Sequence, residues 1–347
     1  MVEYILCVYL TIFLSNMRKL FYLSLVIILL FFTSCFKDDE RIIPIEIDEI
    51  EIPFSVYEYQ TYYNISDGSV VSHNHYSEWD LGFESSTEGY HIILNYSRFM
   101  YAGNTFDTDF YSVTSNNADE MLFDNSSGNL DSTVFIDWVD FTDSENPIFS
   151  KNVYIVDRGK NELGEEFGLK KIVFEKLEED TFYIHYANLD NTEDHFYKIP
   201  KDSNVNFALF SLEDEGNMVV QEPDKLIWDI CFTKYSTIIP DDFGVPTDYL
   251  VRGVLLNPNK NIEVALDTVN YFYNITFDIM LEYTYLSTRD AIGYDWKVFT
   301  NDFYTIRENN SYILRDVNGV SYKIRFTDFY NDIGEKGFPA FEIKELE

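Results

Sequence analysis

One motif occurs twice in this chain, and the segments around both copies keep the same order. Residues 79–83 read Trp-Asp-Leu-Gly-Phe, and residues 228–232 read Trp-Asp-Ile-Cys-Phe. Each copy is followed by a second tryptophan, Trp138 or Trp296, and sixteen residues later by a tyrosine that opens an apolar run. The matched landmarks lie about 150 to 158 residues apart. Because landmarks seldom recur in one order by chance, we predict that one folding module is used twice.

The apolar residues of both modules alternate with polar residues, as they do in strands with one buried face. Residues 322–326 read Tyr-Lys-Ile-Arg-Phe, and few windows show a helical period. Aromatic residues, which suit half-buried pleated surfaces, make up 18% of the chain. We therefore predict an all-β fold of two tandem antiparallel modules, at residues 52–190 and 195–347.

The N-terminal region has the order of charges and apolar residues that is typical of a lipoprotein signal. A basic Arg-Lys pair precedes an apolar run at residues 20–32, and Thr-Ser then leads to Cys35. This run is shorter than the roughly 20 residues that a transmembrane helix needs, so a signal peptide is favoured over a membrane anchor. We predict a signal peptide at residues 17–34, lipidation of Cys35, and an acidic tether at residues 35–51.

Charge and cysteine content exclude several classes of protein. A net charge of −35 would repel the phosphate backbone, so nucleic acid is not expected as a partner. Beyond Cys35 the chain contains only Cys231, so the mature protein can form no internal disulfide. The sequence contains no nucleophile elbow, phosphate-binding loop, His-Glu-x-x-His or Cys-x-x-Cys motif. We therefore expect a binding protein, not an enzyme.

Three segments of the C-terminal module occur in a known order: the Trp-Asp motif at 228–232, the Ser-Tyr-Lys-Ile-Arg-Phe strand from residue 321, and Lys-Gly-Phe-Pro-Ala-Phe at 336–341. In these segments the module resembles the HmuY family, which are all-β haem-binding lipoproteins of Bacteroidota. The N-terminal module is similar to a more diverged copy, most clearly at residues 79–83. The resemblance implies haem capture at the cell surface and delivery to a TonB-dependent outer-membrane receptor. The acidic residues after Cys35 resemble a surface-export signal, which implies a lipid anchor on the outer membrane.

The resemblance does not supply iron ligands in the C-terminal module. Family members bind haem iron through two histidines on opposite faces, but no histidine follows Trp228, and some members use methionines. Met280 is the single methionine in that interval. A second ligand would then be a tyrosine or come from the other module.

Further candidates for cofactor binding lie in the N-terminal module. They are His73, His75, His91, Met100 and Arg98. His73 and His75 are two residues apart, so in a strand they share one face with Cα atoms roughly 7 Å apart and cannot both be axial ligands of one haem. They could hold a transition metal with Glu78, or be solvated. Arg98 could meet either a haem propionate or a nearby carboxylate.

Two other functions stay open from the sequence. The chain could be an accessory protein of an outer-membrane transporter that does not bind haem. It could also be a carbohydrate-binding surface lipoprotein, for which an exposed aromatic platform would be the distinguishing feature. For the Trp-Asp pairs themselves we predict a structural role, because a buried indole needs a partner and an adjacent aspartate can accept from backbone N–H groups.

Overall fold

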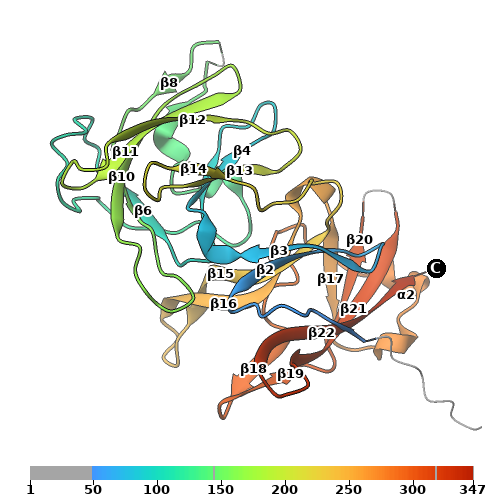
Figure 1. Ribbon diagram of the computed structural model, residues 1–347. Helices are drawn as coiled ribbons and strands as arrows, with labels where there is room; N and C mark the ends of the chain where they lie inside the picture. Colours follow the sequence, from blue (N-terminus) through green and yellow to red (C-terminus); the bar gives the residue numbers. More distant parts are fainter. Residues whose placement is uncertain (1–48, 144, 317–318, 347) are drawn as a thin grey trace, which may run out of the picture. The chain divides into compact units, whose positions relative to one another are not determined.

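Antiparallel strands form most of the regular secondary structure, as the alternation of apolar and polar residues predicts (Figure 1). The computed structural model describes residues 49–143, 145–316 and 319–346. The predicted signal peptide, Cys35 and nearly all of the predicted tether at 35–51 lie outside these residues. Within them, no helix is long and apolar enough to cross a membrane. The all-β prediction is confirmed.

Two five-stranded antiparallel sheets are the largest elements. The first has the order β12-β11-β10-β9-β6, and its strands are β6 (Tyr101–Asn104), β9 (Tyr154–Asp157), β10 (Leu169–Glu178), β11 (Thr181–Asn188) and β12 (His195–Pro200). The second has the order β1-β22-β21-β20-β17, and its strands are β1 (Ile50–Glu51), β17 (Glu263–Asp267), β20 (Ser311–Arg315), β21 (Ser321–Tyr330) and β22 (Lys336–Leu346). In both sheets, strands that follow one another in the chain pair as hairpins. The turn between β10 and β11 has positive φ at Glu179 and Asp180 (49° and 58°), the combination of a two-residue type I′ turn.

Two four-stranded sheets mix the two halves of the sequence. One has the order β14-β13-β4-β5, with β4 (Leu81–Glu84), β5 (Ile92–Leu94), β13 (Phe207–Ser211) and β14 (Asn217–Val219). The other has the order β16-β15-β2-β3, with β2 (Tyr59–Asn64), β3 (Ser69–His75), β15 (Ile230–Pro240) and β16 (Pro246–Leu256). The hairpin that precedes each Trp-Asp motif therefore pairs with the strand that follows the other motif.

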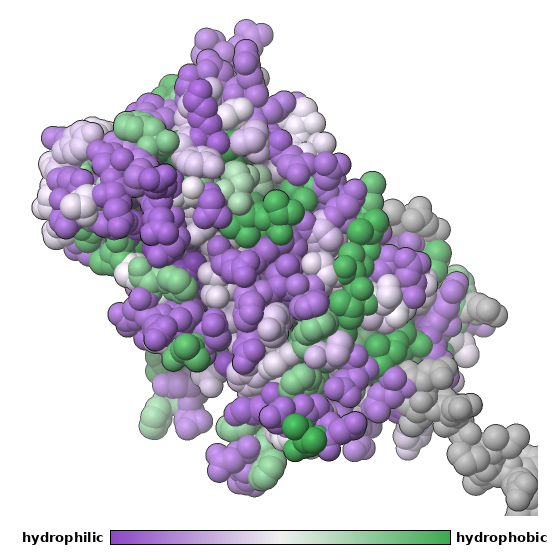
Figure 2. Space-filling view, viewed as in Figure 1, coloured by the Kyte–Doolittle hydropathy of each residue, from purple (hydrophilic) through white to green (hydrophobic). Residues whose placement is uncertain are grey.

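The remaining elements are short. They are the strand pairs β7 (Val139–Asp140) with β8 (Ile148–Phe149) and β18 (Lys297–Thr300) with β19 (Phe303–Ile306), the 3-10 turns η1 (Tyr76–Glu78), η2 (Leu130–Ser132), η3 (Ile136–Trp138), η4 (Pro258–Lys260) and η5 (Phe272–Asn274), and the helix α2 (Phe277–Met280). On the face drawn in Figure 2, hydrophobic residues gather in patches among mostly hydrophilic ones, as the high charge of the chain would lead one to expect.

The exchange of hairpins is also visible in the two large hydrophobic cores. One core draws its buried residues from a continuous stretch, between Leu81 and Leu212. The other combines residues 52–65 with residues 230–341. We call the first packed unit the continuous lobe and the second the split lobe. Each buried large apolar side chain contributes about 1.5–3 kcal/mol, so the exchanged hairpins are tightly held. The module boundaries predicted at 52–190 and 195–347 describe the sequence repeat and stay a prediction.

The two Trp-Asp motifs fasten these exchanged hairpins. Asp80 Oδ2 accepts a hydrogen bond from the backbone N–H of Leu212, at 2.6 Å, just after β13. Asp229 Oδ2 accepts one from the backbone N–H of Ile65, at 2.7 Å, just after β2. Each aspartate thus ties its own strand to the hairpin that comes from the other half of the chain. These bonds confirm the predicted structural role of the aspartates. The expected partner of the buried indole is wrong, because within the described residues the N–H groups of Trp79 and Trp228 have no hydrogen-bond partner.

Buried lysines occupy matching places in the two large sheets. Lys171 on β10 donates to the main-chain carbonyls of Phe110 and Val113, at 2.8 Å each. Lys323 on β21 donates in the same way to two carbonyls of residues 272–275, at 2.8 Å each. This matched geometry is what the repeated use of one module would produce.

Candidate functional site

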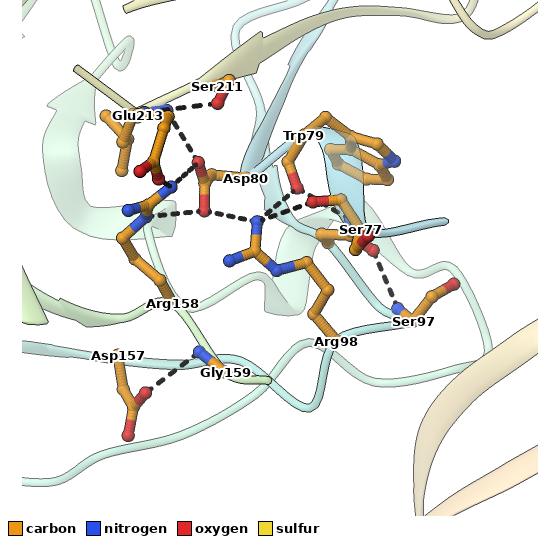
Figure 3. Close-up of polar contacts among 12 residues, drawn as sticks. Ser77, Trp79, Asp80, Ser97, Arg98, Asp157, Arg158, Gly159, Ser211 and Glu213 are labelled. Carbon is orange, nitrogen blue, oxygen red and sulfur yellow. Dashed lines mark hydrogen bonds and ion pairs between the residues drawn. The ribbon is translucent and has the colours of Figure 1, made fainter. Parts of the chain in front are cut away.

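A buried charge cluster surrounds Asp80 of the first Trp-Asp motif (Figure 3). Arg98 Nη1 donates to Asp80 Oδ1 at 2.8 Å, and Arg158 donates through Nε to the same oxygen and through Nη2 to Oδ2, both at 3.0 Å. The Asp80 and Arg98 side chains are 0% and 1% exposed. Two buried guanidinium groups thus share one carboxylate. Glu213 supplies the second negative charge, with Oε2 at 2.6 Å from Arg158 Nη2.

Four separate segments bring these charges together. Asp80 directly precedes β4, Arg98 follows the turn after β5, Arg158 follows β9, and Glu213 follows β13. Burial lowers the pKa of Arg98. Burial also acts to lower the pKa of Arg158, but Asp80 and Glu213 outweigh it and the pKa is raised. Both arginines remain charged at neutral pH, because the ordinary pKa of arginine is above 12.

Phe167 covers both guanidinium groups. Its ring centroid lies 3.7 Å from Arg98 Cζ and 5.3 Å from Arg158 Cζ, within range of a cation–π interaction. The loop that carries Phe167 is held close to the backbone of Arg98, since Lys160 donates its N–H to the Arg98 carbonyl at 3.1 Å. At Gly159, φ is +68° and an added Cβ would lie 2.1 Å from that carbonyl oxygen, so only glycine fits this approach. In the part of the chain that the structure describes, Arg98 Nε and Nη2 have no hydrogen-bond partner beneath the ring.

An open groove of about 530 Å³ adjoins this cluster. That volume is in the range of about 300–1,000 Å³ that is usual for small-molecule sites. One wall of the groove is apolar and comes from β14 and the Phe167 ring, and the rest includes Arg158 and carboxylates. The lining residues are Ser77, Glu78, Arg158, Phe167, Ser211, Glu213, Asn217, Met218, Val219 and Val220. This combination suits a flat, largely apolar ligand with an anionic edge.

A second cavity lies between the two lobes but is much smaller. It has a volume of about 70 Å³, and Ile93, Tyr96, Phe207, Tyr235 and Arg289 are among the residues that line it. It has room for a few water molecules and not for a flat polycyclic molecule. The open groove is therefore the better candidate for a ligand of that size.

The structure places both methionines that the sequence singles out inside hydrophobic cores. Met100 is 1% exposed in the core of the continuous lobe, and Met280 is 2% exposed in a small cluster with Ala265 and Ile275. Iron ligation by either would require its core to open, and both assignments stay predictions. Met218, which the sequence reasoning overlooked, is half-buried and lines the groove.

The histidines that the sequence singles out lie in two different settings. His73 is exposed on β3 with its ring stacked 3.4 Å from Phe54, and His75 packs 4.4 Å from Tyr59. His91 is instead engaged, since its Nδ1 lies 2.5 Å from Glu84 Oε2. Burial acts to raise the pKa of Glu84, but hydrogen bonds from His91 and Ser86 outweigh it and lower the pKa to about 2.

The sequence alternative of a metal held by His73, His75 and Glu78 is not supported. Within the residues that the structure describes, no group of three His, Cys, Asp or Glu side chains could hold a metal ion. Glu78 Oε2 accepts a hydrogen bond from Gln221 Nε2 at 2.6 Å instead. Of the two partners considered for Arg98, the structure shows the carboxylate, which is Asp80.

Sequence reasoning also missed Arg158, Phe167 and Glu213. Arg158 carries a weak signal, since it directly follows the apolar strand that begins at Tyr154. The pairing itself had no local signal, because Arg158 and Asp80 are 78 residues apart in the chain.

One family model matches most of the chain. The family model described as HmuY protein matches residues 56–343. Among solved structures, an apo HmuY analogue of Tannerella forsythia is 12% identical, with 87% of this chain and 96% of that chain covered and a TM-score of 0.25. A putative HmuY-like haem-binding protein of Bacteroides vulgatus is 17% identical, with 38% and 79% covered and a TM-score of 0.18. A putative lipoprotein of Bacteroides fragilis is 14% identical, with 50% and 88% covered and a TM-score of 0.21. No curated protein matches the chain.

Proposed function

Because the match over residues 56–343 shows that the chain belongs to the HmuY family, we propose that it is a haem-binding protein of the cell surface. It would capture haem and pass it to a TonB-dependent outer-membrane receptor. In this role the protein binds haem and catalyses no reaction. The family match carries this proposal, and a relative in Bacteroides vulgatus is itself described as a putative haem-binding protein. A lipid on Cys35 would anchor the protein to the outer membrane without spanning it.

Within this proposal, haem binds in the open groove. Met218 lines it, and a methionine thioether is an established axial ligand of haem iron. Arg158 lines it too, and its Nη2, which contacts Glu213, would donate to a haem propionate. Val219 and Val220 provide apolar surface for the porphyrin. A haem in this groove would receive one protein ligand from it, Met218.

The proposal predicts saturable haem binding by the soluble chain that begins after Cys35. Titration with haemin should give a shifted Soret band with one haem per chain. Met218→Ala should weaken binding by about tenfold or more and change the spectrum, since the thioether is lost. Met121→Ala serves as the matched control, because Met121 is also half-buried but lies on a different cavity.

The spectra separate the possible outcomes. If Met121→Ala or the double variant His73→Ala/His75→Ala loses the band and Met218→Ala does not, haem binding stands but the groove is the wrong site. Weak absorbance that never saturates in the unaltered chain would contradict the proposed function itself.

A further inference from the structure

Glu213 occupies the groove at the point where an incoming carboxylate would meet Arg158. Its side chain is 54% exposed, lines the groove, and contacts Arg158 Nη2 at 2.6 Å. Arg158 itself is 4% exposed. Within the described residues, Arg158 is the single partner found for the Glu213 carboxylate. Half-exposed ion pairs of this kind gain little free energy, because water competes for both charges.

Asp80, the other carboxylate of the cluster, is held very differently. It is 0% exposed and accepts hydrogen bonds from Arg98, from Arg158 and from the backbone N–H of Leu212. Removing one partner of such a buried pair is strongly destabilising, because it leaves a buried charge uncompensated. Of the two carboxylates that neutralise the arginines, only Glu213 can therefore leave at small cost (Figure 3).

The second arginine has unused hydrogen-bond donors at the same place. Arg98 is 1% exposed, yet among the described residues its Nε and Nη2 have no hydrogen-bond partner beneath the Phe167 ring. A buried donor without a partner is destabilising, so the cluster is not fully satisfied as it stands. Phe167 also lines the groove, so a movement of its ring would open these donors to a molecule bound there.

We propose that the groove binds a flat, apolar molecule through a carboxylate that displaces Glu213 from Arg158, and that Phe167 moves aside so that Arg98 becomes the second donor. Glu213 is then an internal substitute for the ligand carboxylate. The inference rests on the proposed function for the identity of the natural ligand, since haem is flat and carries two carboxylates. It does not depend on iron, because the interactions that it invokes are made at the anionic edge.

Iron-free probes test this directly on the soluble chain. The probe is 1-pyrenebutyrate, which is flat, fluorescent and carries one carboxylate, and its control is the uncharged 1-pyrenebutanol. The carboxylate probe should bind saturably and at least about tenfold more tightly than the alcohol. Equal affinities for the two probes would overturn the inference.

A matched pair of variants isolates the role of Glu213. Glu213→Gln should tighten binding of 1-pyrenebutyrate by about threefold or more, because the competing carboxylate is gone. Glu215→Gln removes the same charge from the same exposed turn, and no ion pair between Glu215 and an arginine is found among the described residues, so this variant should leave the affinity within about twofold. If the two variants behave alike, the effect is general electrostatics and the displacement of Glu213 is refuted.

The variant Phe167→Leu tests whether the Phe167 ring blocks access to Arg98. Circular dichroism is the control that this variant is folded. Loss of the ring should tighten binding of 1-pyrenebutyrate and leave binding of 1-pyrenebutanol weak. An unchanged affinity for the carboxylate probe would remove Phe167 and Arg98 from the proposal.

Failure of this inference and failure of haem binding give different results. If the chain binds haemin and Glu213→Gln leaves that affinity unchanged, the inference alone is contradicted. If Glu213→Gln changes the affinity for 1-pyrenebutyrate but the chain does not bind haemin, the proposed function alone is contradicted.

Discussion

At the scale of single residues, the two Trp-Asp aspartates do the same work with different charge partners. Asp80 faces the buried Arg98 and Arg158, whereas Asp229 faces Lys260, whose side chain is 28% exposed at 3.3 Å. Solvent screens the second pair far more than the first. The sequence, which shows the same two letters at both places, could not reveal this difference, because the basic partners come from distant segments.

This difference predicts unequal effects of removing each charge. Asp80→Asn should lower the free energy of unfolding by about 3–5 kcal/mol, because two guanidinium groups lose their buried counter-charge. Asp229→Asn keeps an amide at the equivalent place and should cost only about 1 kcal/mol, since Lys260 can turn to water. Urea unfolding followed by tryptophan fluorescence measures both. Equal losses would show that the buried arginines do not depend on Asp80 as described.

Two buried lysines predict a pH dependence of stability. Burial lowers the pKa of Lys234 and of Lys297 to about 7, and their Nζ atoms lie over the rings of Tyr76 and Trp296. The unfolded chain, with an ordinary lysine pKa near 10.4, then binds more protons above pH 7 than the folded chain does. The free energy of unfolding should therefore rise from pH 7 to pH 8.5, by up to about 1.4 kcal/mol per pH unit for each lysine.

The predicted rise in the free energy of unfolding is limited to pH 7 to 8.5 because of Cys231. Burial raises the pKa of the Cys231 thiol to about 12, so above pH 8.5 this thiol lowers the free energy of unfolding as the pH rises. Lys297→Met should flatten the rise between pH 7 and pH 8.5, and Lys336→Met, at an exposed position, should leave it unchanged. A wild-type stability that is level or falls across this window would contradict the assignment of depressed lysine pKa values.

At the scale of strands and hairpins, the sequence predicts the elements well and their partners poorly. Alternation marks β11 and β21, and the turn residues mark where strands end. The hairpins β2–β3 and β13–β14 both carry a positive-φ glycine, Gly68 or Gly216, and both precede a Trp-Asp motif. By local pattern, either hairpin could form backbone hydrogen bonds with β4 or with β15, the strands that follow the two motifs. The local sequence therefore does not determine which pairing forms. The exchange is decided by packing over the whole chain.

The candidate site was harder to predict than the strands for the same reason. Residue types with a known haem chemistry drew attention to His73, His91, Met100 and Met280, but two of these are core residues and one is held by a carboxylate. The groove residues Arg158, Phe167 and Met218 look ordinary in the sequence. They meet because β14 of the exchanged hairpin lies beside the loop between β9 and β10.

At the scale of the whole molecule, the continuous lobe contains the groove, the charge cluster and a complete hydrophobic core. Its buried residues run from Leu81 to Leu212, including Ala208 and Phe210 of β13. The sequence module at 52–190 lacks β12, β13 and β14, and so would expose the edges of β4 and β11 together with the core side that those strands cover. The unit that folds by itself should therefore be the packed lobe and not the sequence repeat.

We predict that a fragment of residues 76–222 folds cooperatively, whereas a fragment of residues 52–190 does not. The first should show near-ultraviolet circular dichroism from its packed tryptophans and a sigmoidal urea transition; the second should lack both, because roughly 1.5–3 kcal/mol is lost for each core side chain left in water. If the groove is the binding site, the fragment 76–222 should also bind 1-pyrenebutyrate like the full chain. Cooperative folding of 52–190 with stability equal to that of 76–222 would mean that β2–β3 can replace β13–β14 on β4, and that the exchange is one of two arrangements open to this chain.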